Sequence, residues 1–346
     1  MTKFGTKNGG NSFRESQGEV GMTISEVSKL FENHENVERI VGEMQKNVLM
    51  ENEEEQDSDF QVVINCSEER AIRHPTTPID TPGYPLMGIE FEKCTSVPID
   101  TSEKCVNYST LLHVTYQESN QLQCETQKQS ECPKWYALKY PRLTASKFGD
   151  ICKKMEISRA KPKLLADKLL QQNPPTTFVD RMLKWGRENE DVAVQVYRGL
   201  GDYKMVKIFP CGFYISPEDS FLGATPDRVV YDPLARHPWG ILEVKCPYSV
   251  KKKTAIQAAK EVKTFMCREE NGLLFLKESD PYYYQVQGQM GITGAKWCDF
   301  IVYTTQGISV QRIEYDSDFW KAEAKKLGEF YFSHFLPKYI MLQVSV

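Results

Sequence analysis

The chain has 346 residues, of which 40% are hydrophobic, so it can form one large domain or two modest ones. Its first ten residues are polar and no apolar run approaches the length of a membrane span, so we expect neither a secretory signal nor a membrane protein. Its ten cysteines form no C-x-x-C pair, which argues against zinc fingers and favours a reduced, intracellular protein.

The net charge of −4 is unevenly distributed along the chain. Residues 1–130 hold 11 Lys and Arg against 22 Asp and Glu, whereas residues 131–346 hold 32 against 25. A basic C-terminal body suits a polyanionic partner such as DNA. The acidic N-terminal part either solubilises the chain or occupies the basic surface in cis, and solubilisation is the simpler interpretation.

The first 104 residues are expected to be a largely disordered acidic tail that contains one helix. Residues 1–22 are rich in Gly, Asn and Ser, and residues 72–101 carry the Pro/Thr-rich sequence HPTTPIDTPGYP. Apolar residues at helical spacing over 23–48 predict a small helix that could dock on a protein partner. A single folded domain is predicted over 105–346.

Helical and strand periods alternate through this second part of the chain. In chain order they predict a helix over 144–154, helices over 162–171 and 178–200, strands over 203–209 and 212–215, strands over 227–231 and 241–245, helices over 251–267 and from 281, strands over 300–304 and 308–315, and a helix over 318–335.

Two carboxylates and a lysine would meet if the strands over 227–231 and 241–245 pair. Glu243 and Lys245 share a face of their strand because side chains alternate, and Asp227 can then lie beside Glu243. Like charges make a poor core, whereas oxygen ligands suit Mg²⁺, which relieves the repulsion. A Glu-x-Lys triplet alone also arises by chance at a solvated strand edge.

Candidate anion-binding groups stand near predicted helix starts. Arg142, Thr144 and Ser146 lie where free N–H groups and the helix dipole favour a phosphate, although ordinary capping explains them equally well. A second group lies at the start of the helix predicted over 251–267, where an external anion would offset the positive charge and a solvated charge run is the alternative: Lys251, Lys252 and Lys253.

Two helices carry further polar candidates. Glu188, Glu190 and Asp191 are so close together that at least one is expected to face a positive charge. Gln285 and Gln289 are four residues apart and share a helix face.

The segments RLTAS, WGRENE, GATPD, LEVKCP and YYYQVQGQM resemble, in this order and spacing, those of the YqaJ-type viral recombinase family. This family is akin to lambda-type alkaline exonucleases within the PD-(D/E)xK nuclease superfamily. Each segment alone is weak evidence, whereas five in order are strong. The resemblance covers residues 131–335 and implies an α/β (α+β) fold with a restriction-endonuclease-like mixed β-sheet flanked by helices.

The resemblance also implies roles for the acids and the lysine. Asp227, Glu243 and the carbonyl of Val244 would bind Mg²⁺ or Mn²⁺, and Lys245 would orient or help deprotonate the attacking water. Glu190 would help hold a metal-bound water or a second metal ion. The family often has Ser-Pro-Asp-Gly where this chain has TPDR, and this departure leaves the carboxylate of Asp227 in place.

Other residues match family positions near the DNA. Gln285 would act close to the reacting groups and Gln287 would lie near the DNA, while Arg142 and Ser146 would surround a terminal 5′-phosphate. Thr144 and the three lysines at 251–253 are candidates for phosphate or DNA-backbone contacts because of their places at predicted helix starts rather than because of the resemblance.

These implications predict a metal-dependent 5′-to-3′ exonuclease that acts on linear duplex ends in recombination or repair. The alternatives are a structure-dependent endonuclease of the same superfamily and a non-catalytic protein that binds DNA ends. A protein-interaction module in the N-terminal region could coexist with any of them. A homo-oligomer and a nuclear location are further expectations from the resemblance.

Overall fold

The computed structural model of the chain describes residues 60–66, 101–157, 161–171, 176–203 and 205–344. All of them belong to a compact unit that spans 55–346, and the predicted helix over 23–48 and the HPTTPIDTPGYP segment lie outside them. Across this described part, no helix combines the length and hydropathy that crossing a membrane requires. The nine cysteines within it are free thiols.

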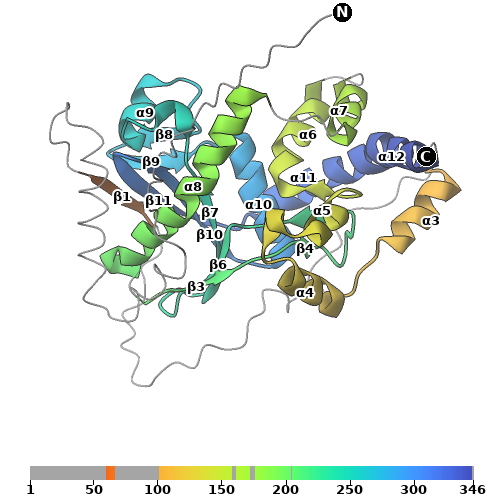
Figure 1. Cartoon of the computed structure of the whole chain (residues 1–346), viewed down its shortest axis with the longest axis horizontal. Helices are drawn as coiled ribbons and strands as arrows, with labels where there is room; N and C mark the ends of the chain where they lie inside the picture. Colours follow the sequence, from red (N-terminus) through yellow and green to blue (C-terminus); the bar gives the residue numbers. More distant parts are fainter. Residues whose placement is uncertain (1–59, 67–100, 158–160, 172–175, 204, 345–346) are drawn as a thin grey trace, which may run out of the picture. The chain divides into compact units, whose positions relative to one another are not determined.

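A six-stranded mixed sheet forms the centre of this unit, in the order β1-β11-β10-β7-β6-β3 (Figure 1). The central strand β7 (Trp239–Lys245) runs parallel to β10 (Trp297–Thr304) and antiparallel to β6 (Arg228–Tyr231). The remaining strands are β1 (Gln61–Asn65), β11 (Gly307–Glu314) and β3 (Lys207–Pro210). A mixed sheet flanked by helices confirms the predicted fold class.

The edge strand β1 was not predicted. It pairs in parallel with β11, from Gln61 opposite Gly307 to Asn65 opposite Gln311. The side-chain amide of Asn65 also donates to the carbonyl of Leu274 at 2.9 Å. Residues 61–65, which were predicted to belong to the N-terminal tail, therefore add an edge strand to the sheet of the C-terminal domain. Five residues are too short to show a reliable strand period.

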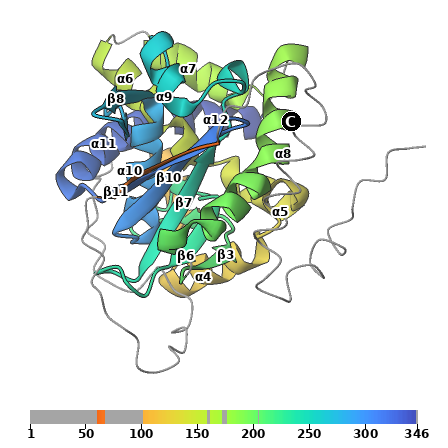
Figure 2. The same cartoon turned by 90° about the vertical axis from the view of Figure 1, so that its left-hand side faces the viewer.

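Helices cover both faces of the sheet. The long helix α8 (Thr177–Gly199) lies along one face, and α6 (Ala145–Ile157), α10 (Pro281–Thr293) and α11 (Ser317–Phe330) pack together on the other (Figure 2). The other elements are α3 (Glu103–Leu111), α4 (Tyr116–Glu125), α5 (Pro133–Lys139), β2 (Leu143–Thr144), α7 (Lys161–Leu170), β4 (Tyr214–Ile215), β5 (Leu222–Ala224), α9 (Ala255–Glu261), β8 (Cys267–Glu270), β9 (Leu273–Leu276) and α12 (Leu336–Val344).

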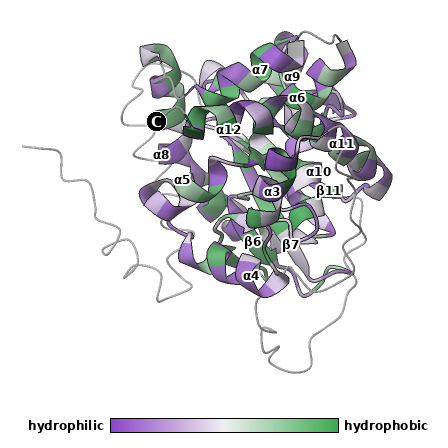
Figure 3. Cartoon of the chain, turned by 90° about the vertical axis from the view of Figure 1, so that its right-hand side faces the viewer, coloured by the Kyte–Doolittle hydropathy of each residue, from purple (hydrophilic) through white to green (hydrophobic). Residues whose placement is uncertain are grey.

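Alternation along β6 and β7 divides the core in two. Val229 and Ile241 face the cluster that includes α6, α10 and α11, whereas Val230 and Leu242 face α8. The outer helices mix hydrophilic and hydrophobic residues, as Figure 3 shows for α4 and α5, which is typical of helices with one face toward a core.

Helix α10 packs unusually closely against its neighbours. A Cβ added at Gly288 would lie 2.4 Å from the ring of Phe148, so only glycine allows this approach of α10 to α6. Gln285 and Gln289 stand on either side of Gly288 along the helix and are both buried. Close packing thus carries these two amides toward the sheet.

Two predicted helices differ from the observed ones. The helix predicted over 251–267 is the shorter α9, because Thr254 and Gln257 form a capping box that starts it after the lysines, and the hairpin β8–β9 follows. The helix predicted over 318–335 continues through a π-helical segment, Tyr331–Phe335, into α12. The apolar end of the chain is thus helical as far as Val344.

Candidate active site

Asp227, Glu243 and Lys245 converge at the ends of β6 and β7. The amide of Asp227 donates to the carbonyl of Leu242 at 3.1 Å, which extends the ladder by one residue and sets Asp227 opposite Glu243. Asp227 Oδ2 accepts a hydrogen bond from the amide of Val244 at 2.7 Å. The predicted strand pairing therefore brings the two acids and the lysine to one place.

The carboxylate of Glu243 is held by three side chains. Its Oε1 accepts from Lys245 Nζ at 2.5 Å and from Gln285 Nε2 at 2.6 Å, and its Oε2 accepts from Gln289 Nε2 at 2.7 Å. Glu243 is only 2% exposed. Three hydrogen bonds to one carboxylate leave it little freedom to rotate, so this arrangement fixes the orientation of Glu243.

The single positive charge of Lys245 does not balance the two negative charges that Asp227 and Glu243 can carry. Burial, followed by the nearby Glu243 and Glu190, raises the pKa of Asp227 well above its ordinary value. Burial opposes the charge of Lys245, but Glu243 and Asp227 outweigh it and hold the lysine pKa above its usual range. The Lys245 ammonium also lies 4.3 Å from the ring centroid of Tyr282. An additional cation would relieve the repulsion between the carboxylates.

The donor set fits a hard divalent cation. Asp227 and Glu243 supply carboxylate oxygens, and the Val244 carbonyl between the two site residues of β7 supplies a neutral one, which are the ligands Mg²⁺ prefers. No cluster of three His, Cys, Asp or Glu side chains that could hold a metal ion occurs in the described residues.

Glu190 lies on α8 and is paired with Arg228. Arg228 Nη1 lies 2.9 Å from Glu190 Oε1, and Arg228 Nη2 pairs with Asp191. Burial raises the pKa of Glu190, although Arg228 opposes this effect, and Glu243 adds to it. Arg228 is thus the positive group that the cluster of acids on this helix faces.

A small pocket adjoins the carboxylates on the α10 side of the sheet. It has a volume of about 170 Å³, and Thr144, Ser146, Gln285 and Gln289 are among the residues that line it. The hydroxyl oxygens of Thr144 and Ser146 lie 3.4 Å apart. The predicted phosphate-binding hydroxyls and the glutamines that hold Glu243 therefore share one cavity.

Lys139 and Trp135 also line this pocket, and the sequence reading missed both. Lys139 Nζ lies 3.4 Å from the centroid of the Trp135 ring, as a cation–π pair. Burial, together with the nearby charge of Lys147, lowers the pKa of Lys139 to about 8. Trp135 and Lys139 are four residues apart on α5, and residues with this spacing share a helix face. The spacing could therefore have identified them as a pair from the sequence.

Arg142 is not placed to bind a phosphate directly, which corrects the expectation from the sequence. It is 7% exposed, and its Nε, Nη1 and Nη2 donate to the carbonyls of Ser220, Leu138 and Leu112 at 2.8, 2.8 and 3.0 Å. Burial lowers the pKa of Arg142 to about 10. Arg142 therefore ties the backbone at Ser220, Leu138 and Leu112 together.

Gln287 likewise turns away from the predicted DNA side. It is fully buried, its Nε2 donates to the carbonyl of Glu314 at 2.9 Å, and its Oε1 accepts from the amide of Asp316 at 2.9 Å. Residues two apart on a helix point in different directions, so Gln287 cannot share the face of Gln285. Gln289, at the i+4 position, takes that place.

The three lysines precede α9 and do not form a single cluster. Lys251 Nζ lies 4.6 Å from the ring centroids of both Trp185 and Tyr248. Lys253 pairs with Glu261, and Lys252 is exposed. Lys251 and Lys252 remain candidates for a backbone contact, whereas Lys253 already has an acidic partner.

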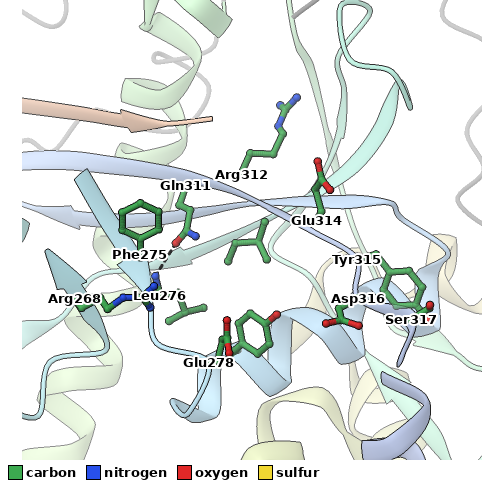
Figure 4. A pocket seen from close by; sticks show the side chains of 12 residues that line it. Arg268, Phe275, Leu276, Glu278, Gln311, Arg312, Glu314, Tyr315, Asp316 and Ser317 are labelled. Carbon is green, nitrogen blue, oxygen red and sulfur yellow. Dashed lines mark hydrogen bonds between the residues drawn. The ribbon is translucent and has the colours of Figure 1, made fainter. Parts of the chain in front are cut away.

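A larger cavity of about 530 Å³ lies elsewhere, beside β9 and β11 (Figure 4). Arg268, Gln311, Glu314 and Asp316 are among the residues around it, and the side chain of Gln311 accepts from the amide of Leu276 at 2.7 Å. None of the predicted site residues lines it, whereas Thr144, Ser146 and Gln285 line the smaller pocket.

Residues 134–296 match the family described as the YqaJ-like viral recombinase domain. This match confirms the predicted resemblance, and its range contains every residue predicted to act in the site. No match was found among the curated proteins.

Several solved structures are similar in fold. An alkaline exonuclease from Laribacter hongkongensis is 22% identical, with 62% of this chain and 98% of that chain covered and a TM-score of 0.45. The shutoff and exonuclease protein of the Kaposi's sarcoma associated herpesvirus is 13% identical, with 62% and 71% covered and a TM-score of 0.38. A phage related exonuclease from Haemophilus somnus 129PT is 14% identical, with 60% and 98% covered and a TM-score of 0.37.

Proposed function

Residues 134–296 carry a YqaJ-like viral recombinase domain, and from this premise we propose that the protein is a metal-dependent deoxyribonuclease acting on linear duplex ends. The observation that carries the proposal is the convergence of Asp227, Glu243 and Lys245 at the ends of two adjacent strands. Buried like charges are costly unless they bind something, and a divalent cation over a DNA phosphate satisfies them.

The chemistry follows from the charges of these groups. Mg²⁺ or Mn²⁺ held by Asp227, Glu243 and the Val244 carbonyl would activate a water and stabilise charge on the phosphate. Lys245, whose pKa the two acids beside it hold above its usual range, would orient the water and neutralise charge on the phosphate. Gln285 and Gln289 keep Glu243 in place during turnover.

The small pocket supports recognition of a terminal 5′-phosphate. The hydroxyls of Thr144 and Ser146 and the ammonium of Lys139 line it, and all three can donate to phosphate oxygens. Because Gln285 and Gln289 line the same pocket, a terminal phosphate there would lie next to the carboxylates. The 5′-to-3′ polarity of the proposed exonuclease rests on this pocket.

The test uses end-labelled linear duplex DNA, with and without a 5′-phosphate, and covalently closed circular DNA. We expect Mg²⁺-dependent degradation of linear DNA, faster with the 5′-phosphate, no cleavage in EDTA, and intact circles. Cleavage of circles would favour the endonuclease, and binding of ends without turnover in Mg²⁺ or Mn²⁺ would favour the end-binding protein. A homo-oligomer, a protein partner of the N-terminal region and a nuclear location stay predictions.

A further inference from the structure

Asp227 and Arg228 are consecutive residues whose side chains take opposite sides of the sheet. Asp227 lies with Glu243 and Lys245 on the α10 side, while Arg228 points toward α8. Arg228 reaches Glu190 and Asp191, and its Nη1 also donates to the carbonyl of Asp227 at 2.5 Å. A permanent positive charge is thereby fixed directly beside the carboxylates.

The contact with Glu190 is partly shielded from solvent, whereas the contact with Asp191 is not. The side chains of Arg228 and Glu190 are 20% and 32% exposed, and that of Asp191 is 79% exposed. Arg228 therefore interacts mainly with Glu190, since exposed ion pairs are weak. Arg228 Nη1 contacts both Glu190 Oε1, at 2.9 Å, and the backbone carbonyl of Asp227, at 2.5 Å, so Glu190 lies close to the backbone of Asp227.

We propose that Arg228 occupies the role of a second divalent cation beside Glu190, so that this site binds one metal ion. The inference rests on the proposed metal-dependent nuclease and specifies how many ions its site takes. An arginine stays protonated under all ordinary conditions, so its charge does not leave the site when pH changes. Because Glu190 is already bonded to Arg228, its carboxylate is not available to hold a second metal ion. The positive charge of Arg228 also repels a second ion.

A purely structural role for Arg228 would be to fasten α8 to β6. The two roles differ in one measurable quantity, the number of ions bound per chain. A structural role predicts lower stability on substitution with unchanged stoichiometry. The proposed role predicts that removal of the guanidinium frees Glu190 and creates a second ion site.

The experiment titrates Mn²⁺ alone into the full chain and follows the electron paramagnetic resonance signal of free Mn²⁺. We expect one bound ion in the wild type, two in Arg228→Gln, one in Arg228→Lys, and one in Arg228→Gln combined with Glu190→Gln. Asp191→Asn is the matched control, because it removes the exposed partner and leaves the Glu190 contact, and it should bind one ion. Circular dichroism verifies that each variant is folded.

Two bound ions in the wild type, or one in folded Arg228→Gln, would overturn the inference while leaving the nuclease proposal intact. No bound ion in the wild type would overturn both. If Arg228→Gln does not fold, Glu190→Gln alone decides the question. Its Mn²⁺ affinity should match that of the wild type within about twofold, whereas a loss of tenfold or more would identify Glu190 as a metal ligand and overturn the inference.

Discussion

Gln289 donates to Glu243 Oε2 at 2.7 Å, while its own Oε1 has no hydrogen-bond partner among the described residues although it is buried. A buried carbonyl oxygen without a partner is costly and indicates that something else fills the place when the protein works. The pocket that Gln289 lines is the place where substrate or water would supply that donor.

We therefore expect Gln289→Leu to reduce cleavage. The substitution keeps the size of the side chain but releases one oxygen of Glu243, and loss of such a supporting contact typically costs about 10- to 100-fold in activity or metal affinity. Single-turnover cleavage of linear DNA and Mn²⁺ binding are the measurements. Gln121→Leu, at an exposed position of α4, is the matched control. An unchanged rate would show that Gln285 and Lys245 suffice to hold Glu243.

Gln287→Leu should act on stability instead. The substitution leaves the partly buried backbone carbonyl of Glu314 and amide of Asp316 without their side-chain partners, which costs about 1–3 kcal/mol, and Tm should fall by a few degrees. The preference for 5′-phosphorylated over unphosphorylated ends should match that of the wild type. A selective loss of this preference at full stability would restore the role that the sequence first suggested for Gln287.

The difference between these two glutamines marks where sequence reasoning stops. Spacing of four residues correctly placed Gln285 and Gln289 on one face, and strand alternation correctly placed Glu243 beside Asp227, because both depend only on local backbone geometry. Which side of a helix is buried depends on tertiary packing. The family motif therefore indicated Gln287 and Arg142 as site residues, although the side chains of both form hydrogen bonds with backbone groups instead.

Contacts between residues that are far apart in the sequence explain why the other groups near the site were not predicted. The contact between Arg228 and Glu190 requires α8 to lie beside β6, and no local pattern contains that information. Lys139 and Trp135 join Ser146 only because α5 leads into β2 and α6 around a common pocket. Sequence alone thus located the two acids, the lysine and the two glutamines that hold Glu243, but not the pairing of Arg228 with Glu190 or the place of Lys139 and Trp135.

Asp227→Asn should abolish cleavage and also stabilise the metal-free protein. Because the folded-state pKa of Asp227 is raised, burying this group costs stability at neutral pH, and the cost declines as pH falls from the raised pKa and is lost below the ordinary pKa of an unfolded Asp. The amide removes the cost at all pH values. Cleavage should fall by about 10³-fold or more, as for loss of a key electrostatic group.

The measurement for this variant is Tm with and without Mn²⁺. Mn²⁺ should raise the Tm of the wild type and leave that of Asp227→Asn nearly unchanged, while DNA binding persists in both. Asp150→Asn, at an exposed position of α6, should respond to Mn²⁺ as the wild type does. Equal Mn²⁺ shifts in wild type and Asp227→Asn would contradict the assignment of Asp227 as a ligand. Full cleavage by Asp227→Asn or by Lys245→Ala would remove the site assignment.

The preference for a 5′-phosphate should weaken as pH rises. Lys139 has a pKa lowered to about 8, so it is charged below that pH and loses its charge above it. A bound phosphate favours the charged form, so the preference should decline at or somewhat above pH 8. Lys139→Arg should keep the preference to higher pH, and Lys139→Met should lower it at the pH values where the wild-type lysine is charged, so that the two proteins converge at high pH. A flat profile in the wild type would exclude Lys139 from end recognition.

The last prediction concerns β1 and the boundary of the folded domain. Removal of residues 1–54 should leave Tm unchanged, whereas removal of residues 1–66 should lower it by about 5–10 °C, because buried apolar side chains and a ladder of backbone hydrogen bonds are lost. Val63 and Val62 provide a matched pair, since Val63 is 8% exposed and Val62 is 46% exposed. Val63→Asp should therefore destabilise the protein and Val62→Asp should not. Equal Tm values for the two truncations would instead support a folded domain that begins at residue 105.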